Sequence, residues 1–137
     1  RYLLFLCVAN SARSQLAEGI ARSLAPAGVR VASAGSSPTS LRPEARAVLE
    51  ELGLETSTHH AKGIDDLAGQ PVEAVFTLCA EEVCPVWLGE AARVHWGLPD
   101  PADVQADPPA RLQAFREVRD ELRYRLGLLF EGLQGEC

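Results

Sequence analysis

The most constraining stretch of this chain is its beginning, which predicts a strand, a short loop and a helix in direct succession. Residues 1–6 are almost wholly apolar after the first position and predict a buried strand. The loop Cys-Val-Ala-Asn-Ser-Ala-Arg-Ser follows at residues 7–14. Apolar residues then recur at helical spacing, namely Leu16, Ala17, Ile20, Ala21 and Leu24. A strand that leads directly into a helix favours an α/β fold.

The same loop carries the clearest chemistry of the chain. Cys7 ends the strand, and Arg13 follows it by six residues where the helix begins. Loop amides and a helix N-terminus bind an anion, and the same field favours an ionised, nucleophilic sulfur. The guanidinium of Arg13 suits two oxygens of phosphate or arsenate, and Ser14 could donate its hydroxyl to the thiolate. We therefore expect an oxyanion site formed by Val8, Ala9, Asn10, Ser11, Ala12, Arg13 and Ser14.

A purely structural interpretation of this loop is also open. Cys7 could be a buried thiol at a strand end, Arg13 a surface residue and Ser14 only a helix cap. The strand before the loop, the helix after it and the polar residues inside the turn favour a reaction centre.

The remaining pattern alternates strands with helices. Strands are predicted at residues 29–34, 72–78 and 94–96, helices at 43–53 and 107–133, and one helical turn at 64–67. We expect a single domain over residues 1–137, with a four-stranded parallel sheet and helices on both faces. In such sheets the site lies beyond the carboxyl ends of the strands, which would bring Cys7, Cys79 and Asp100 to one rim.

Two further cysteines follow the third predicted strand. Cys79 and Cys84 are five residues apart, and a segment that bends between them could alternate between a dithiol and a disulfide. Two alternatives are buried packing of both thiols and a zinc site completed by His59, His60 or His95.

Asp100 stands in a stretch that begins apolar and then turns sharply before Pro101. If its carboxyl group faces the loop of Cys7, it could protonate a leaving oxygen. The alternative is an aspartate that only stabilises a turn. His59 and His60 are predicted on the solvated surface, and Cys137 as an incidental exposed thiol.

Composition limits the function classes. The net charge is −6 with no Lys/Arg block, which argues against nucleic acid and anionic lipid as partners. No run of eighteen apolar residues and no leader segment occur, so we expect neither a membrane span nor a signal peptide, and a cytoplasmic location. Four cysteines in such a chain favour catalytic, redox or metal-binding roles.

With these motifs in hand, the chain resembles the thioredoxin-coupled arsenate reductases, which share the fold of the low-molecular-weight protein tyrosine phosphatases. The resemblance runs from Tyr2 to about Leu133 and is carried by residues 7–19, 33–35, 77–79, 84–85, 95–97 and 100–102. Residues 77–79 and 84–85 match the reductases. The aromatic residues that typically follow the aspartate-proline pair in the phosphatases are absent, since Ala102 and Asp103 stand there.

The resemblance implies a relay of thiols. Cys7 would attack arsenate held by the loop and Arg13, while Asp100 protonates the departing oxygen. Cys79 would then attack Cys7 and release arsenite, and Cys84 would attack Cys79 to leave a disulfide that thioredoxin reduces. Weak phosphatase activity, no cofactor and a monomer are also expected. A phosphatase working through a Cys7 phosphoenzyme is the main alternative, and an oxyanion sensor without turnover is a third.

Two positions depart from the pattern of the reductases. The gap between Cys79 and Cys84 is shorter, which affects the geometry of the final disulfide. Some relatives bind potassium with an asparagine, a glutamate, a serine and an aspartate. Asn10, Glu18 and Ser33 match the first three, but Lys62 stands about where the aspartate would be, so we predict no metal.

Overall fold

A parallel sheet of four strands in the order β2-β1-β3-β4 forms the centre of the molecule. The computed structural model describes residues 1–80, 87, 89–104 and 107–134. Its strands are β1 (Tyr2–Cys7), β2 (Arg30–Gly35), β3 (Ala74–Thr77) and β4 (Ala92–His95). Its helices are α1 (Arg13–Leu24), α2 (Pro43–Glu50) and α3 (Pro108–Gln134), with 3-10 turns η1 (Ile64–Leu67) and η2 (Pro101–Asp103).

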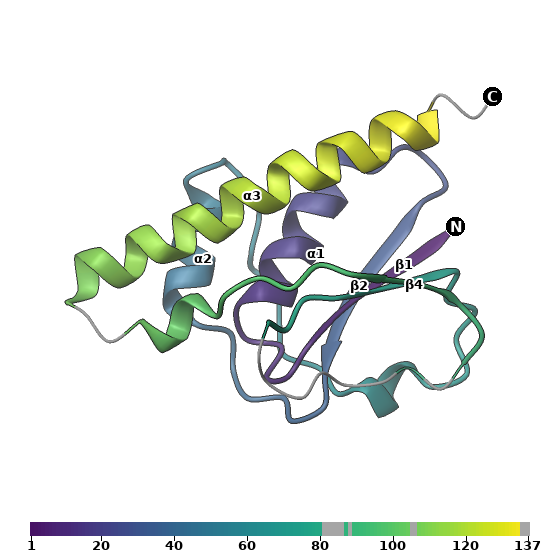
Figure 1. The fold of residues 1–137 in the computed structure, drawn as a ribbon, viewed down its shortest axis with the longest axis horizontal. Helices are drawn as coiled ribbons and strands as arrows, with labels where there is room; N and C mark the ends of the chain where they lie inside the picture. Colours follow the sequence, from purple (N-terminus) through teal and green to yellow (C-terminus); the bar gives the residue numbers. More distant parts are fainter. Residues whose placement is uncertain (81–86, 88, 105–106, 135–137) are drawn as a thin grey trace.

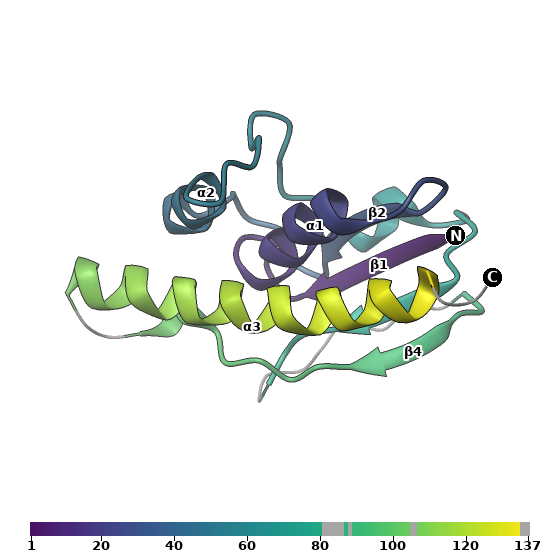
Figure 2. The ribbon, with the colours of Figure 1, turned by 90° about the horizontal axis from the view of Figure 1, so that it is seen from above.

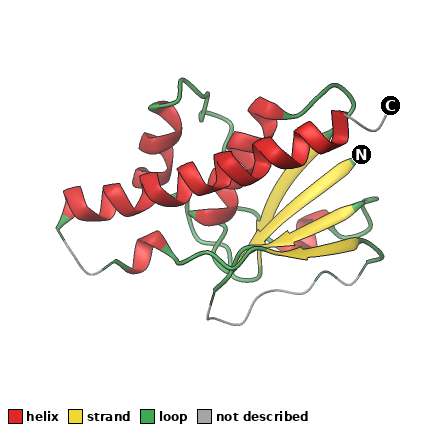
Figure 3. Ribbon diagram, turned by 45° about the horizontal axis from the view of Figure 1, so that its top comes forward, coloured by secondary structure: helices red, strands yellow, loops and turns green. Residues whose placement is uncertain are grey.

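The central strand explains why the chain begins with an apolar run. β1 lies between β2 and β3, and all six of its residues are buried. A strand covered on both faces has no solvated side, so its sequence is continuously apolar instead of alternating. Figure 3 shows the strands side by side, with their carboxyl ends directed to the same end of the molecule, where loops gather.

The two faces of the sheet are covered unequally. The three α-helices pack on one face around a core that includes Leu16, Phe76, Phe115 and Leu122. α3 runs the length of the molecule and crosses both α1 and α2 (Figures 1 and 2). The other face is covered by η1, and Leu67 packs there with the inner side chains of the sheet. The expected four-stranded parallel sheet is confirmed. Helices were expected on both faces, but within the described residues the second face carries only the 3-10 turn η1, because all three α-helices share the first core.

Local signals set the ends of the helices. Pro43 opens α2, where the missing N–H of proline costs no hydrogen bond. The side chain of Asp107 accepts a hydrogen bond from the Ala110 amide (3.0 Å) and caps α3. Among the described residues, no helix combines the length and apolar character needed to cross a membrane.

A cluster of charges joins α2 to α3. Glu51, just after α2, accepts hydrogen bonds from Arg116 (2.8 Å) and Arg119 (2.6 Å) of α3. The hydrogen bond from Arg116 is the main reason why the pKa of Glu51 falls to about 2. Ion pairs as well as apolar contacts therefore hold α3 against the end of α2.

Candidate active site

The loop predicted to bind an oxyanion lies at the carboxyl edge of the sheet, between β1 and α1. We call residues 7–14 the oxyanion loop. The carbonyl oxygens of Val8, Ala9 and Ser11 accept hydrogen bonds from the amides of Ser37 (2.9 Å), Thr39 (3.0 Å) and Arg42 (3.0 Å), respectively. The C=O and N–H of a trans peptide unit point in opposite directions. The amides that follow these carbonyls are thus directed to the other side of the loop.

A cavity of about 230 Å³ opens on the loop. Its described lining is Cys7, Val8, Ala9, Ser11, Ala12, Arg13, Asp100 and Asp103. Cys7 is a free, buried thiol. The fold therefore brings a nucleophile, a cation and two carboxylates from distant parts of the chain to one small cavity.

Backbone carbonyls in the segments that follow β3 and β4 fix the position of the Arg13 side chain. It is 4% exposed, and its Nη1 donates to the carbonyl of Leu98 (2.9 Å). A longer contact joins Nη1 to the carbonyl of Leu78 (3.5 Å), and Nη2 lies 3.8 Å from Oδ2 of Asp100. These carbonyls restrict the rotation of the guanidinium of Arg13, which lines the cavity.

Ser14 contacts the thiol directly. Its Oγ lies 2.8 Å from Sγ of Cys7 and accepts a hydrogen bond from Nδ2 of Asn10 (2.7 Å). Because that amide can only donate, the hydroxyl hydrogen of Ser14 remains available for the sulfur. Asn10 holds this position with a positive φ of 50°, a region that asparagine tolerates better than most residues.

A buried polar network supports the loop from below. Asn10 also donates to Oγ of Ser33 (2.9 Å), which in turn donates to Oε1 of Glu18 (2.8 Å). Nζ of Lys62 lies 3.3 Å from the same carboxylate oxygen and 3.2 Å from the carbonyl of His60. Burial alone would raise the pKa of Glu18, but the Lys62 ammonium and the Ser33 hydroxyl outweigh it and the pKa is lowered.

The position of His59 differs from the predicted one. His59 was predicted on the surface with His60, but it is 7% exposed and its Nδ1 lies 3.1 Å from Oε1 of Gln15. Burial lowers the pKa of His59, against the opposing field of Glu18. Gly19 leaves room for the ring, because a Cβ there would lie 3.2 Å from Cε1 of His59. His60 is exposed, as predicted.

Cys79 lies at the same edge as Cys7, two residues beyond β3. The amide of Leu78 donates to the carbonyl of Leu6 (2.9 Å), so the segment entering Cys79 runs beside the residue before Cys7. Cys79 is buried and disulfide-bonded. Cys84 and Cys137 lie outside the described residues.

Asp100 stands at the rim of the cavity and also caps η2, since its Oδ1 accepts a hydrogen bond from the Ala102 amide (3.0 Å). The turn-stabilising and site-lining interpretations of this residue are therefore compatible. Asp103, which belongs to none of the predicted motifs of the site, lines the same cavity from the end of η2.

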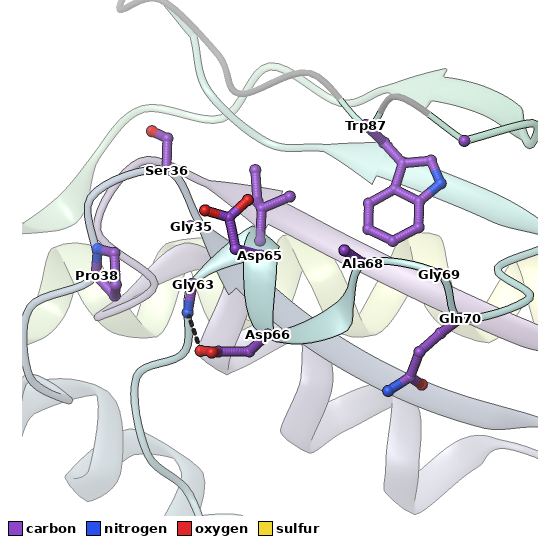
Figure 4. Close-up of a pocket in the computed structure, with 12 residues that line it drawn as sticks. Gly35, Ser36, Pro38, Gly63, Asp65, Asp66, Ala68, Gly69, Gln70 and Trp87 are labelled. Carbon is purple, nitrogen blue, oxygen red and sulfur yellow. Dashed lines mark hydrogen bonds between the residues drawn. The ribbon is translucent and has the colours of Figure 1, made fainter.

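A larger cavity of about 810 Å³ lies on the other side of the sheet edge, between η1 and Trp87 (Figure 4). Its described lining includes Asp65, Asp66 and Gln70 but neither a cysteine nor a cationic side chain. Chemistry on an oxyanion therefore belongs to the smaller cavity, where Cys7 and Arg13 are.

Comparison with known proteins agrees with this geometry. The family described as low molecular weight phosphotyrosine protein phosphatase matches residues 2–137. The chain belongs to this family. Within it, the chain is 36% identical over 128 residues to an arsenate reductase of Halalkalibacterium halodurans, with 92% of both proteins covered.

Solved structures of arsenate reductases are also similar to this chain. An arsenate reductase in its phosphate-binding state has 29% identity and a TM-score of 0.77, with 96% of this chain and 98% of that one covered. A thioredoxin-dependent arsenate reductase of Corynebacterium glutamicum has 27% identity and a TM-score of 0.75, with 99% of this chain and 63% of that one covered. The resemblance to arsenate reductases on this fold is confirmed.

Proposed function

We propose that this protein reduces arsenate to arsenite by a thiol relay that thioredoxin recycles. The observation that carries the proposal is the cavity in which the free thiol of Cys7 meets Ser14 and Arg13, with Cys79 at the end of a neighbouring strand. The relatives named arsenate reductase support this choice over other activities of the fold.

The first step uses the residues of the cavity. The Cys7 thiolate attacks arsenic, while Arg13 and the loop amides hold the oxygens and Asp100 supplies a proton to the departing one. Donors fixed before the reaction stabilise charge that develops on the oxygens, and Arg13 is fixed by its bond to Leu98.

The second step transfers the electrons. Cys79 attacks the sulfur of Cys7, a disulfide forms, and the electron pair of the S–As bond stays on arsenic, which leaves as arsenite. Cys84 then attacks Cys79 and frees Cys7, and thioredoxin reduces the resulting Cys79–Cys84 bond. This sequence needs the segment that carries Cys79 and Cys84 to move. We also propose a cytoplasmic location, because reduced thiols are maintained in that compartment. The monomeric state stays a prediction.

The test is oxidation of reduced thioredoxin that depends on arsenate. Cys7→Ser and Cys79→Ser should each abolish it, whereas Cys137→Ser serves as the matched control and should retain it. Parallel assays with glutaredoxin and glutathione identify the reductant. Full arsenate turnover in Cys79→Ser would contradict the relay.

A second candidate function is hydrolysis of phosphate monoesters, which the family match favours. Phosphate has the shape and charge of arsenate, so Cys7 could form a phosphoenzyme in the same cavity. We expect slow hydrolysis of p-nitrophenyl phosphate that Cys79→Ser leaves largely intact. A wild type that hydrolyses the ester but never oxidises thioredoxin would make phosphatase activity the function, and binding of phosphate without any turnover would favour a sensor.

A further inference from the structure

His95 lies beside the segment that carries Cys79, on the side of the sheet that the α-helices do not cover. Its Nδ1 lies 2.7 Å from Oγ1 of Thr77, the last residue of β3. The two residues are partners in the β3–β4 register. This hydrogen bond orients the imidazole, so its second nitrogen, Nε2, has a defined place.

The position of Nε2 is marked by Gly97. A Cβ on Gly97 would lie 3.2 Å from Nε2 of His95, 3.4 Å from the carbonyl oxygen of Cys79 and 3.6 Å from Cα of Ala80. The imidazole and the backbone at Cys79 therefore flank the same small space, which the missing side chain of Gly97 keeps open.

The side chain of Cys79 belongs to the same face of the sheet. Phe76 and Leu78 pack in the core with the α-helices. Because successive side chains of an extended segment alternate, Thr77 is directed to the opposite face, and the same alternation continued past the end of β3 predicts that face for Cys79. On β4, Val94 and Trp96 pack against the helical core, so His95 shares the face of Thr77 and Cys79.

Neighbouring cations are directed elsewhere. Arg93 shares the face of His95, but its guanidinium donates to the carbonyl of Gly89 (3.0 Å). Arg125 of α3 lies over the ring of Trp96, on the helical face. His95 itself is exposed, so it can exchange a proton with water.

We infer that, once the disulfide of Cys79 has been reduced, His95 accepts the proton that Cys79 must lose before it attacks Cys7, an inference that rests on the proposed relay. The proton moves from the Cys79 thiol to Nε2, and the thiolate then forms the S–S bond with Cys7. The electron pair of the broken S–As bond stays on arsenic, and the imidazolium returns its proton to water. Only the thiolate is the nucleophile in such exchange, so a nearby base increases its rate.

The experiment is a single turnover without thioredoxin, with reduced protein and arsenate mixed and arsenite measured over time from about pH 6 to pH 9. For Nε2 to act as a base, Nδ1 must carry the hydrogen and donate to Oγ1 of Thr77. In His95→Asn the new Nδ2 can still donate a hydrogen bond to that oxygen, but no base remains at the place of Nε2. We expect arsenite formation to slow about tenfold or more at neutral pH. The deficit should disappear near pH 9, since an unassisted thiol ionises at about pH 8.5. Added imidazole should restore part of the rate.

Three controls separate this role from a structural one. Hydrolysis of p-nitrophenyl phosphate by Cys7 and the unfolding temperature should be unchanged in His95→Asn. Thr77→Val, which removes the orienting hydroxyl, should show a smaller loss with the same pH dependence. Arg93→Gln, a change on the same face of β4, should leave the rate of arsenite formation unchanged.

An arsenite rate in His95→Asn equal to that of the wild type at every pH would overturn the inference. Parallel loss of arsenite formation and phosphate ester hydrolysis would also overturn it, because it would assign His95 a purely structural role. Failure of the wild type itself to form arsenite is a different result, which contradicts the proposed function and removes the basis of the inference.

Discussion

Cys7 illustrates how one side chain depends on its immediate neighbours. Its sulfur lies 2.8 Å from the hydroxyl of Ser14, and that hydroxyl is oriented by the amide of Asn10. This geometry places the hydroxyl of Ser14 as a hydrogen-bond donor directly against the sulfur.

Replacing Ser14 by alanine should therefore make the sulfur less reactive. A hydrogen bond to a charged group contributes about 1.5–3 kcal/mol, so alkylation of Cys7 by iodoacetamide at neutral pH should slow about tenfold or more. The matched control is Ser23→Ala on the same helix, whose hydroxyl donates to the carbonyl of Ile20 (2.7 Å). An unchanged alkylation rate in Ser14→Ala would show that the loop amides alone activate the thiol.

The carboxylate of Glu18 is the buried negative charge in the polar network that supports the oxyanion loop. Glu18 is 2% exposed and lies between the Ser33 hydroxyl and the Lys62 ammonium. Glu18→Gln leaves that ammonium without its carboxylate partner, and we expect a loss of about 2–3 kcal/mol in the free energy of unfolding. In the exposed pair of Arg125 with Glu121, Glu121→Gln should cost less than about 0.5 kcal/mol. Denaturation by urea measures both.

The pH dependence of this difference follows from the lowered pKa of Glu18. A carboxyl group whose pKa is lower in the folded than in the unfolded state stabilises the fold fully above its ordinary value of 4.5. That contribution is lost as the pH falls through the folded-state pKa. The stability gap between the wild type and Glu18→Gln should therefore be constant near neutrality and shrink in acid. A gap that widens in acid would contradict this assignment.

At the scale of elements, the oxyanion loop depends on close contact with the end of β2. A Cβ on Gly35 would collide with the carbonyl oxygen of Val8 and lie 2.9 Å from the amide nitrogen of Asn10. Distances this short between backbone atoms and a side chain require the loop to move.

Gly35→Ala should thus damage the site more than the fold. We expect p-nitrophenyl phosphate hydrolysis and arsenate reduction to fall about a hundredfold, as in other cases where catalytic groups shift by about 1 Å. Circular dichroism should remain that of a folded protein. The control is Gly127→Ala in α3, where the added methyl group meets no atom within 4 Å and should be neutral or slightly stabilising.

At the scale of the whole molecule, an acidic protein of net charge −6 has to attract an anion with a local site. We expect Arg13, the loop amides and the positive end of α1 to supply that attraction, although Asp100 and Asp103 stand at the rim. Binding of the oxyanion then links the site to the stability of the entire fold, because the unfolded chain has no such cavity.

Phosphate should accordingly raise the unfolding temperature of the wild type. At a concentration a hundred times the dissociation constant, the gain is about 2.7 kcal/mol, which a thermal shift assay detects easily. Arg13→Ala should abolish most of this shift, and sodium chloride at equal ionic strength should not reproduce it. An equal phosphate shift in Arg13→Ala would place the anion away from the oxyanion loop.

Much of the fold follows from local signals that the chain carries. The apolar run before Cys7 forms the central strand, Pro43 and Asp107 begin helices where their chemistry predicts, and residues 64–67 form a turn. The start of the first helix differs from the prediction, since α1 begins at Arg13 and includes both Arg13 and Ser14, which the sequence placed in the loop.

The supporting contacts of the site could not be predicted in this way. Arg13 is oriented by the carbonyl of Leu98, His59 is buried against Gln15, and Lys62 meets Glu18 across more than forty residues of sequence. In each of these pairs the two partners are far apart in the sequence. No periodic pattern of the sequence predicts which backbone carbonyl or polar side chain will become the partner.

The succession of strands and helices and the chemistry of the oxyanion loop can therefore be predicted from the sequence, because hydrophobic periodicity and capping act over a few neighbouring residues. The direction of Arg13, the burial of Glu18 and His59 and the place of His95 near the backbone of Cys79 arise only when these segments pack together. Those outcomes depend on strands and helices meeting in three dimensions, where the cost of burying a polar group selects its partner.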